Sequence, residues 1–284
     1  MSIYIIISLL VIIILLMGLF IYFFQEKFFF QAEKLPADFQ FAYEHLKAEE
    51  KLIETEPGAF ISYLHFYAEG DLKGMVFYLK GNTKSIKGWG KFAIDFTRLG
   101  YDVVMCDYRG FGKSTGRRSN ASMKNDMQFI YDLLKEEYSE NSIIVYGRSL
   151  GSGFASMIAA KNHPKMLILT SPIYSLMNTI QRYLPFMPAK PFMRFNLPTH
   201  KYLKSVTCPI RIIHGSNDNL IPLKTILNLS KVNPDKTRLY TILGAGHLNI
   251  HRFEDYHRIM HEILETPIVE IDHSKTSLHA NHRK

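Results

Sequence analysis

The stretch IIVYGRSLGSGFASMIAA, residues 143–160, decides the fold of this chain. It begins with a β-branched apolar run, which predicts a buried strand, and it ends with small residues that suit a helix packed closely on a sheet. Between the two lies Ser149, flanked by Gly147 and Gly151. A sharp turn here would lift the hydroxyl above the edge of the sheet and aim the first N–H groups of the helix at developing negative charge. The stretch therefore predicts a nucleophilic serine; the structural alternative is a tight turn with an incidental serine.

A serine hydroxyl is a weak nucleophile unless a base removes its proton, so partners are expected further along the chain. In this order of elements the acid follows a later strand, and the histidine comes after the acid. Asp218 follows the apolar run PIRIIHG, and His247 lies in the glycine-rich segment ILGAGHLNI. We expect Ser149 to attack an acyl carbonyl, His247 to act as general base and then general acid, and Asp218 to orient the imidazole. The alternative for Asp218 is an ordinary turn or helix-capping aspartate.

The chain holds 12 histidines, so the candidate catalytic base has to be chosen by its place in the sequence. His214 ends an apolar run and is expected to be structural. His251, His257 and His261 fall at helical positions, where a solvated face is expected. His247 combines a loop position with the required order along the chain.

The acyl oxygen becomes negative during such a reaction and needs two backbone donors. The first is expected to be the N–H of Leu150, directly after the serine. The second is expected from the loop that follows the run MVFYLKGN, near Asn82. Together they predict an oxyanion hole built from backbone groups.

The N-terminus carries an uninterrupted apolar run. Residues 3–24 contain no charged side chain, and as a helix they would span about 33 Å, enough to cross the hydrocarbon core of a bilayer. A cleaved signal peptide is the competing interpretation, but it would need a basic start, a shorter apolar core and a small-residue cleavage site. We therefore expect an uncleaved single-pass anchor. Lys27 and Lys34 follow the run and no basic residue precedes it, which favours a cytoplasmic position for the rest of the chain.

After this anchor the chain alternates between β-rich runs and helix-length segments. The expected strands are AFISYLHFYAE, GMVFYLKG, YDVVMCDYRG, NSIIVYG, KMLILTS, PIRIIHG and TRLYTILG, and the expected helices lie at 119–138, 150–161, 223–232 and 253–264. Apolar runs without strict alternation, separated by helices, predict an α/β fold with a mostly parallel central sheet and helices on both faces.

Four parts are expected along the chain: a membrane anchor at 1–26, a connector at 27–56, an α/β domain at 57–268 and a disordered basic tail at 269–284. Within the domain, residues 172–203 interrupt the alternation with prolines and large apolar side chains. This segment suits a lid over an acyl pocket, and plain core packing is the equal alternative.

Composition excludes several classes of protein. The formal net charge is +8, but no nucleic-acid-binding motif accompanies it, so scattered surface lysines are expected rather than a nucleic-acid partner. Cys106 and Cys208 are expected to be buried free thiols. The sequence has no metal-type Cys/His spacing, no GxGxxG after the first strand and no Walker loop, so neither a metal nor a cofactor is expected. The oligomeric state stays open.

Five motifs in this order, YLKGNTKSIKGW, DYRGFGKSTG, YGRSLGSG, HGSNDNLIP and GAGHLNI, resemble those of the alpha/beta hydrolases over residues 60–264. The resemblance is to the serine-aminopeptidase-like and monoacylglycerol-lipase-like group, and within it to small membrane-anchored members with a short lid. It implies the alpha/beta-hydrolase fold, a structural turn in which Arg109 hydrogen-bonds backbone, and no catalytic role for Asp107. The family places an oxyanion donor after a His-Gly pair, where this chain has Lys80-Gly81.

These observations predict a membrane-anchored serine hydrolase that cleaves a carboxylic ester or thioester, with an acyl lipid among the candidates, through an acyl-enzyme. A serine peptidase on the same fold is the first alternative, because fold and site residues do not choose the substrate. A non-catalytic interaction protein on this fold is the second.

Overall fold

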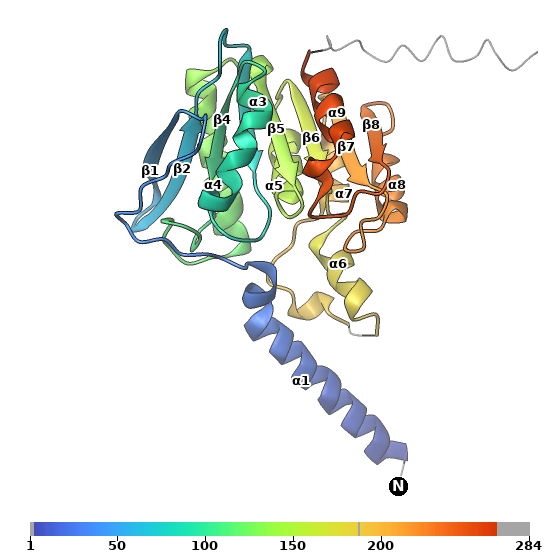
Figure 1. Ribbon diagram of the computed structural model, residues 1–284. Helices are drawn as coiled ribbons and strands as arrows, with labels where there is room; N and C mark the ends of the chain where they lie inside the picture. Colours follow the sequence, from blue (N-terminus) through green and yellow to red (C-terminus); the bar gives the residue numbers. More distant parts are fainter. Residues whose placement is uncertain (1–2, 187, 266–284) are drawn as a thin grey trace, which may run out of the picture.

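The computed structural model describes residues 3–186 and 188–265, and within them the strands form one eight-stranded sheet (Figure 1). The strand order is β1-β2-β4-β3-β5-β6-β7-β8. Neighbours from β4 to β8 pair in parallel, whereas β1 pairs with β2 and β2 with β4 in antiparallel fashion. The strands are β1 Ala48–Glu56, β2 Ala59–Phe66, β3 Gly74–Leu79, β4 Tyr101–Cys106, β5 Ile143–Arg148, β6 Met166–Thr170, β7 Ile210–Gly215 and β8 Thr237–Ile242.

Helices cover both faces of this sheet, because its central strands are apolar on both sides. Along β3, Met75 and Phe77 belong to the core on one face, while Val76 and Tyr78 belong to the core on the other. The helices are α1 Ile3–Phe29, α2 Ile86–Trp89, α3 Ile94–Thr97, α4 Asn120–Glu137, α5 Gly151–Lys161, α6 Leu176–Tyr183, α7 Thr199–Tyr202, α8 Leu223–Ser230 and α9 Glu254–Glu265. The expected α/β architecture with a mostly parallel sheet is confirmed.

The sheet begins earlier than expected. Strand β1 occupies Ala48–Glu56, inside the segment 27–56 that the sequence suggested was a connector. Its sequence AEEKLIETE is mostly charged and mostly exposed, so it lacks the hydrophobic pattern by which a strand is recognised. Charged side chains suit the edge of a sheet, because they discourage pairing with other chains. The predicted tail at 269–284 lies outside the described residues.

Two further expectations concern buried polar groups. Cys106 and Cys208 are buried free thiols, as predicted. Arg109 was expected to bind backbone, but its main partners are carboxylates: it donates to Asp126 at 2.6 and 2.7 Å and also pairs with Glu56. Its one backbone acceptor among the described residues is the carbonyl of Arg117 at 3.4 Å. A guanidinium this deeply buried needs carboxylate partners to balance its charge.

Helix α1 projects from the domain and is long and apolar enough to be a candidate membrane span (Figure 1). Its mean hydropathy reaches 3.2 over an 18-residue window, and only 6% of that window is buried. The helix extends to Phe29, three residues past the expected end of the anchor. Its last turns contact the domain, which matters for the site described next.

Candidate active site

The turn from β5 to α5 holds Ser149 in a conformation that side chains rarely adopt, with φ at +52°. The two flanking glycines explain how the chain can turn so sharply. A Cβ on Gly147 would lie 2.6 Å from the Cβ of Ala155, and a Cβ on Gly151 would lie 1.9 Å from the carbonyl oxygen of Leu79. Neither position therefore accepts a side chain, and the strain at Ser149 is maintained by the packing around it.

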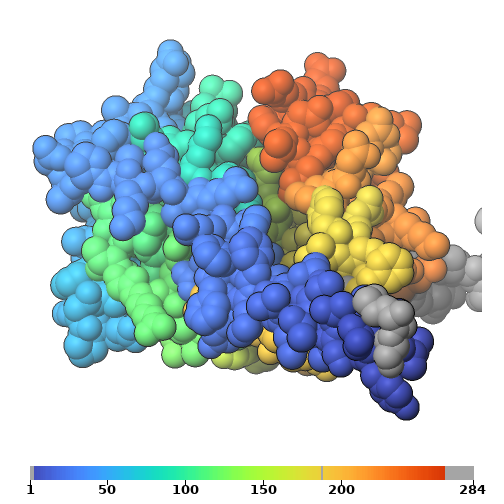
Figure 2. All heavy atoms as spheres, turned by 90° about the horizontal axis from the view of Figure 1, so that it is seen from below, coloured from blue at the N-terminus to red at the C-terminus, as the bar shows by residue number. Residues whose placement is uncertain are grey.

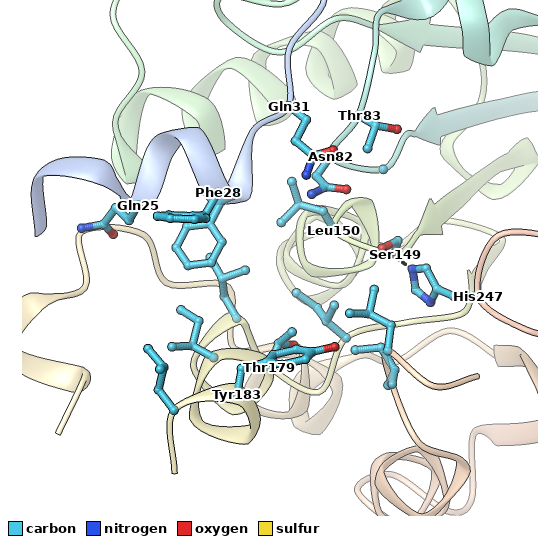
Figure 3. Close-up of a pocket in the computed structure, with 18 of the residues that line it drawn as sticks. Gln25, Phe28, Gln31, Asn82, Thr83, Ser149, Leu150, Thr179, Tyr183 and His247 are labelled. Carbon is cyan, nitrogen blue, oxygen red and sulfur yellow. Dashed lines mark hydrogen bonds between the residues drawn. The ribbon is translucent and has the colours of Figure 1, made fainter. Parts of the chain in front are cut away.

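The structure brings the three predicted side chains into one hydrogen-bonded row, of which Figure 3 shows Ser149 and His247. Ser149 Oγ lies 2.8 Å from Nε2 of His247, and Nδ1 of the same ring lies 2.7 Å from Oδ2 of Asp218. The serine comes from the β5–α5 turn, the aspartate from the loop after β7 and the histidine from the loop after β8. This is the geometry in which an imidazole can take a proton from the hydroxyl while a carboxylate fixes its tautomer.

Asp218 is fixed on both of its oxygens. Oδ1 accepts the backbone N–H groups of Leu220 at 2.9 Å and Ile221 at 2.8 Å, which leaves Oδ2 for His247. Burial by itself would raise the pKa of this carboxyl, but the hydrogen bond and charge of His247 outweigh it, so the pKa lies below its ordinary value. His214 is buried and bonds the carbonyl of Ile221 at 2.9 Å, so its predicted structural role is confirmed.

The two predicted oxyanion donors border the same cavity as Ser149 (Figure 3). The backbone N–H groups of Leu150 and Asn82 donate to no acceptor within residues 3–186 and 188–265. The loop that carries Asn82 lies close to the serine, since a Cβ built on Gly81 would sit 3.7 Å from the Cβ of Ser149. Both N–H groups are therefore free to meet a ligand oxygen, and their role stays a prediction.

Lys80, which stands where the resembled family has histidine, is fully buried beneath this loop. Its Nζ lies 3.3 Å from Oδ1 of Asp107 and donates to the carbonyl of Lys84 at 3.3 Å. Burial lowers the pKa of Lys80 and raises that of Asp107, and each charge counteracts the effect on the other. Asp107 also accepts the N–H of Ile86, so both residues support the loop from below, away from the cavity.

The cavity in front of Ser149 has a volume of about 990 Å³, at the upper end for small-molecule sites. One wall comes from α6, in the segment 172–203 that was predicted to form a lid. The opposite wall comes from α1, which the sequence suggested was only an anchor. The sequence contains only a weak indication that α1 contacts the domain. Gly18 and Gln25, the α1 residues that are buried in the structure, both interrupt its apolar run.

His251 departs from its expected solvated position. It is half-buried in a short 3₁₀ turn, and its Nδ1 lies 3.2 Å from Nη2 of Arg148. Burial, followed by the positive charge of Arg148, lowers its pKa to about 4. His257 and His261 are exposed, as predicted. Within the described part of the chain, no group of three or more His, Cys, Asp or Glu side chains could hold a metal ion.

Residues 70–200 match the family model described as serine aminopeptidase, S33. Among curated proteins, a lysophosphatidylserine lipase, ABHD12, of Gallus gallus is 27% identical over 72% of this chain and 62% of its own length. An uncharacterized protein of Mycobacterium tuberculosis is 26% identical over 69% of this chain and 71% of its own. This chain thus spans less than two thirds of the length of the chicken lipase.

Solved structures share the architecture. The Pyrococcus furiosus esterase Pf2001 superposes with a TM-score of 0.65 at 22% identity, covering 83% of this chain and 97% of its own. The esterase Est1E of Butyrivibrio proteoclasticus, solved with ferulic acid bound, gives a TM-score of 0.58 at 17% identity over 75% of this chain and 96% of its own. At these identities the likeness concerns the fold.

Proposed function

From the alpha/beta-hydrolase fold of this chain, we propose that the protein is a membrane-anchored serine hydrolase that cleaves a carboxylic ester or thioester. The observation that carries the proposal is the row of hydrogen bonds from Ser149 through His247 to Asp218 at the head of an apolar cavity. Helix α1 serves as the anchor.

The proposed reaction proceeds in two halves. Ser149 Oγ attacks the acyl carbon while its proton passes to Nε2 of His247, and the oxyanion is held by the N–H groups of Leu150 and Asn82. His247 then gives that proton to the departing alkoxide or thiolate, which leaves an acyl-enzyme. In the second half, water gives a proton to His247 and attacks the acyl carbon. The proton returns to Ser149 as the carboxylic acid departs.

An ester or thioester is favoured over a peptide by the chemistry of the cavity wall. An aminopeptidase must bind the ammonium group of its substrate, which calls for a carboxylate nearby. None of the described residues that line the cavity is an aspartate or glutamate, and most are apolar. The similarity to a lysophosphatidylserine lipase points the same way, toward an acyl-lipid substrate.

The proposal is tested by offering purified full-length protein a p-nitrophenyl ester and an aminoacyl-p-nitroanilide side by side. We expect hydrolysis of the ester and a loss of at least about a thousandfold in kcat in both Ser149→Ala and His247→Ala, as for residues that act as a unit. His257→Ala is the matched control, because that histidine is exposed and away from the cavity. Faster release of the anilide would favour the peptidase instead, and hydrolysis that survives in Ser149→Ala would refute the proposal.

A further inference from the structure

The membrane-length helix shares a cavity with the predicted nucleophile. Seven residues of α1 line the same cavity as Ser149, and the four that precede its polar end are Leu16, Met17, Phe20 and Ile21. Their spacing of one and four places them along one face of the helix. Across the cavity stand Ile180 and Tyr183 of α6 and neighbouring apolar residues. Figure 2 shows α1 in blue running beside the yellow atoms of α6 on this side of the molecule.

Helix α1 packs against the domain through specific contacts. Gly18 packs against the ring of Phe192 so closely that an added Cβ would lie 2.3 Å from the ring. Gln25 is buried; its amide donates to the carbonyl of Phe192 at 3.0 Å and accepts the N–H of Arg194 at 2.8 Å. Glu26 pairs with the same arginine at 2.5 Å. These contacts fix which face of α1 looks into the cavity.

With α1 as the proposed anchor, the turns that carry Leu16 to Ile21 would lie at the depth of the bilayer leaflet nearest the domain. A hydrocarbon core takes about 20 helical residues, and counted from Ile3 that length ends near Tyr22. Leu16 to Ile21 therefore fall in the last turns within such a core, just before Gln25, which also lines the cavity. Phe186, which follows α6, is 96% exposed, and such an aromatic side chain suits the membrane interface.

We propose that the acyl chain of a bilayer lipid enters this cavity sideways, between α1 and α6, and lies along the α1 face while its ester carbonyl reaches Ser149. This inference rests on the proposed function and adds the substrate class and the route of entry. Between Leu16 and Phe29, helix α1 lines the cavity over about 20 Å at 1.5 Å per residue, a length that suits a long acyl chain. An apolar chain in this position exchanges lipid contacts for apolar side chains, so it need not cross water.

The test compares tryptophan substitutions on the two faces of α1 in full-length protein in detergent micelles. Met17→Trp and Leu16→Trp add bulk at positions that line the cavity, whereas Leu19→Trp and Leu15→Trp add it at comparably exposed positions that do not line it. The measured quantity is the ratio of kcat/KM for p-nitrophenyl palmitate to that for p-nitrophenyl butyrate, which cancels any loss of folded protein. We expect the ratio to fall at least about tenfold in the cavity-facing pair, the scale on which apolar pockets discriminate chain size, and to stay at the wild-type value in the outward-facing pair.

The outcomes separate this inference from the proposed function. If wild type hydrolyses butyrate through Ser149 and all four variants keep the wild-type ratio, only the lateral acyl site is overturned. If the two faces lower the ratio equally, the site is likewise overturned, because bulk anywhere on α1 then has the same effect. If folded wild type hydrolyses neither ester, the proposed function fails and the inference falls with it.

Discussion

The backbone N–H of Gln31 donates a 2.9 Å hydrogen bond to the carbonyl oxygen of Asn82, and Lys84 N returns one of 2.9 Å to the carbonyl of Gln31. The chain that leaves α1 is thus paired with the loop predicted to supply an oxyanion donor. The held carbonyl belongs to the peptide that joins Asn82 to Thr83, directly after the peptide whose N–H is the predicted donor, so the pairing connects the position of the helix with the shape of the loop. Figure 3 shows Gln31 and Asn82 side by side above Ser149.

Removing the donor at Gln31 is expected to disturb the proposed oxyanion hole. Gln31→Pro deletes the N–H, whereas Gln31→Ala shortens only the side chain and keeps the backbone bond. We expect kcat for a short ester in the proline variant to be about tenfold to a hundredfold below that of the alanine variant, since one oxyanion donor contributes at least this much in other hydrolases. Equal kcat values in the two variants would show that the pairing does not shape the site.

The sharp turn at the nucleophile predicts intolerance at Gly151. A Cβ there would lie 1.9 Å from the carbonyl oxygen of Leu79, a backbone atom that cannot move aside without shifting β3. Gly151→Ala should therefore lower the midpoint of thermal unfolding by several degrees or prevent folding, at a cost of at least about 2–3 kcal/mol. Gly88→Ala is the matched control, since its nearest contact is the flexible chain of Lys84 at 3.2 Å. A Gly151→Ala protein as stable as Gly88→Ala would argue against the packing described for the turn.

The buried pair of Lys80 and Asp107 predicts that removing one charge destabilises the fold more than removing both charges. Lys80→Met leaves the carboxylate of Asp107 buried without its cation, which should cost about 3–5 kcal/mol in unfolding free energy. Lys80→Met combined with Asp107→Asn removes both charges and keeps an acceptor for the N–H of Ile86, so a large part of the loss should return. Denaturant unfolding of the detergent-solubilised proteins measures both values.

An exposed pair provides the comparison. Arg258 and Asp255 lie 2.8 Å apart on the surface of α9, and Arg258→Met should cause no measurable loss of stability. A double variant at Lys80 and Asp107 that is less stable than Lys80→Met alone would mean that the two residues do not form a mutually compensating pair.

The lowered pKa of Asp218 predicts how stability depends on pH. Because the folded state binds the proton of this carboxyl less readily than the unfolded chain does, the group stabilises the fold above its ordinary pKa and loses that effect as the pH falls through the folded pKa. The stability advantage of wild type over Asp218→Asn should therefore be largest near pH 6 and shrink toward pH 3. Unfolding free energies at three pH values in this range test the sign, and an advantage that grows toward acid would contradict it.

Much of the fold could be predicted because its central strands and helices carry local patterns. The run before Ser149 is apolar on both faces, and the glycines around it permit one sharp turn, so strand, turn and helix are all visible within a short stretch. Asp218 and His247 could be singled out because each follows a strand in the expected order along the chain. Strand β1 was not predicted because it lies at the edge of the sheet and exposes charged residues, so its sequence looks like that of a polar connector.

The share of α1 in the cavity could not be predicted, because it depends on contacts between distant parts of the chain. Gln25 and Phe192 are separated by 167 positions, and no local sequence pattern predicts a contact between residues that far apart. The role of Lys80 was equally hidden. A lysine after an apolar strand suggests a solvated side chain, and only the fold brings Asp107 within reach of it.

The most direct measurement is fluorophosphonate labelling of the purified full-length protein, followed by mass spectrometry of the intact chain and its peptides. An activated Ser149 attacks phosphorus and displaces fluoride, so we expect one adduct per chain on the peptide that contains Ser149. Labelling should be lost in Ser149→Ala and His247→Ala and kept in His257→Ala. A folded wild-type protein that stays unlabelled, or that carries its adduct on another residue, would contradict the assignment of Ser149, His247 and Asp218 as an assembled nucleophilic site.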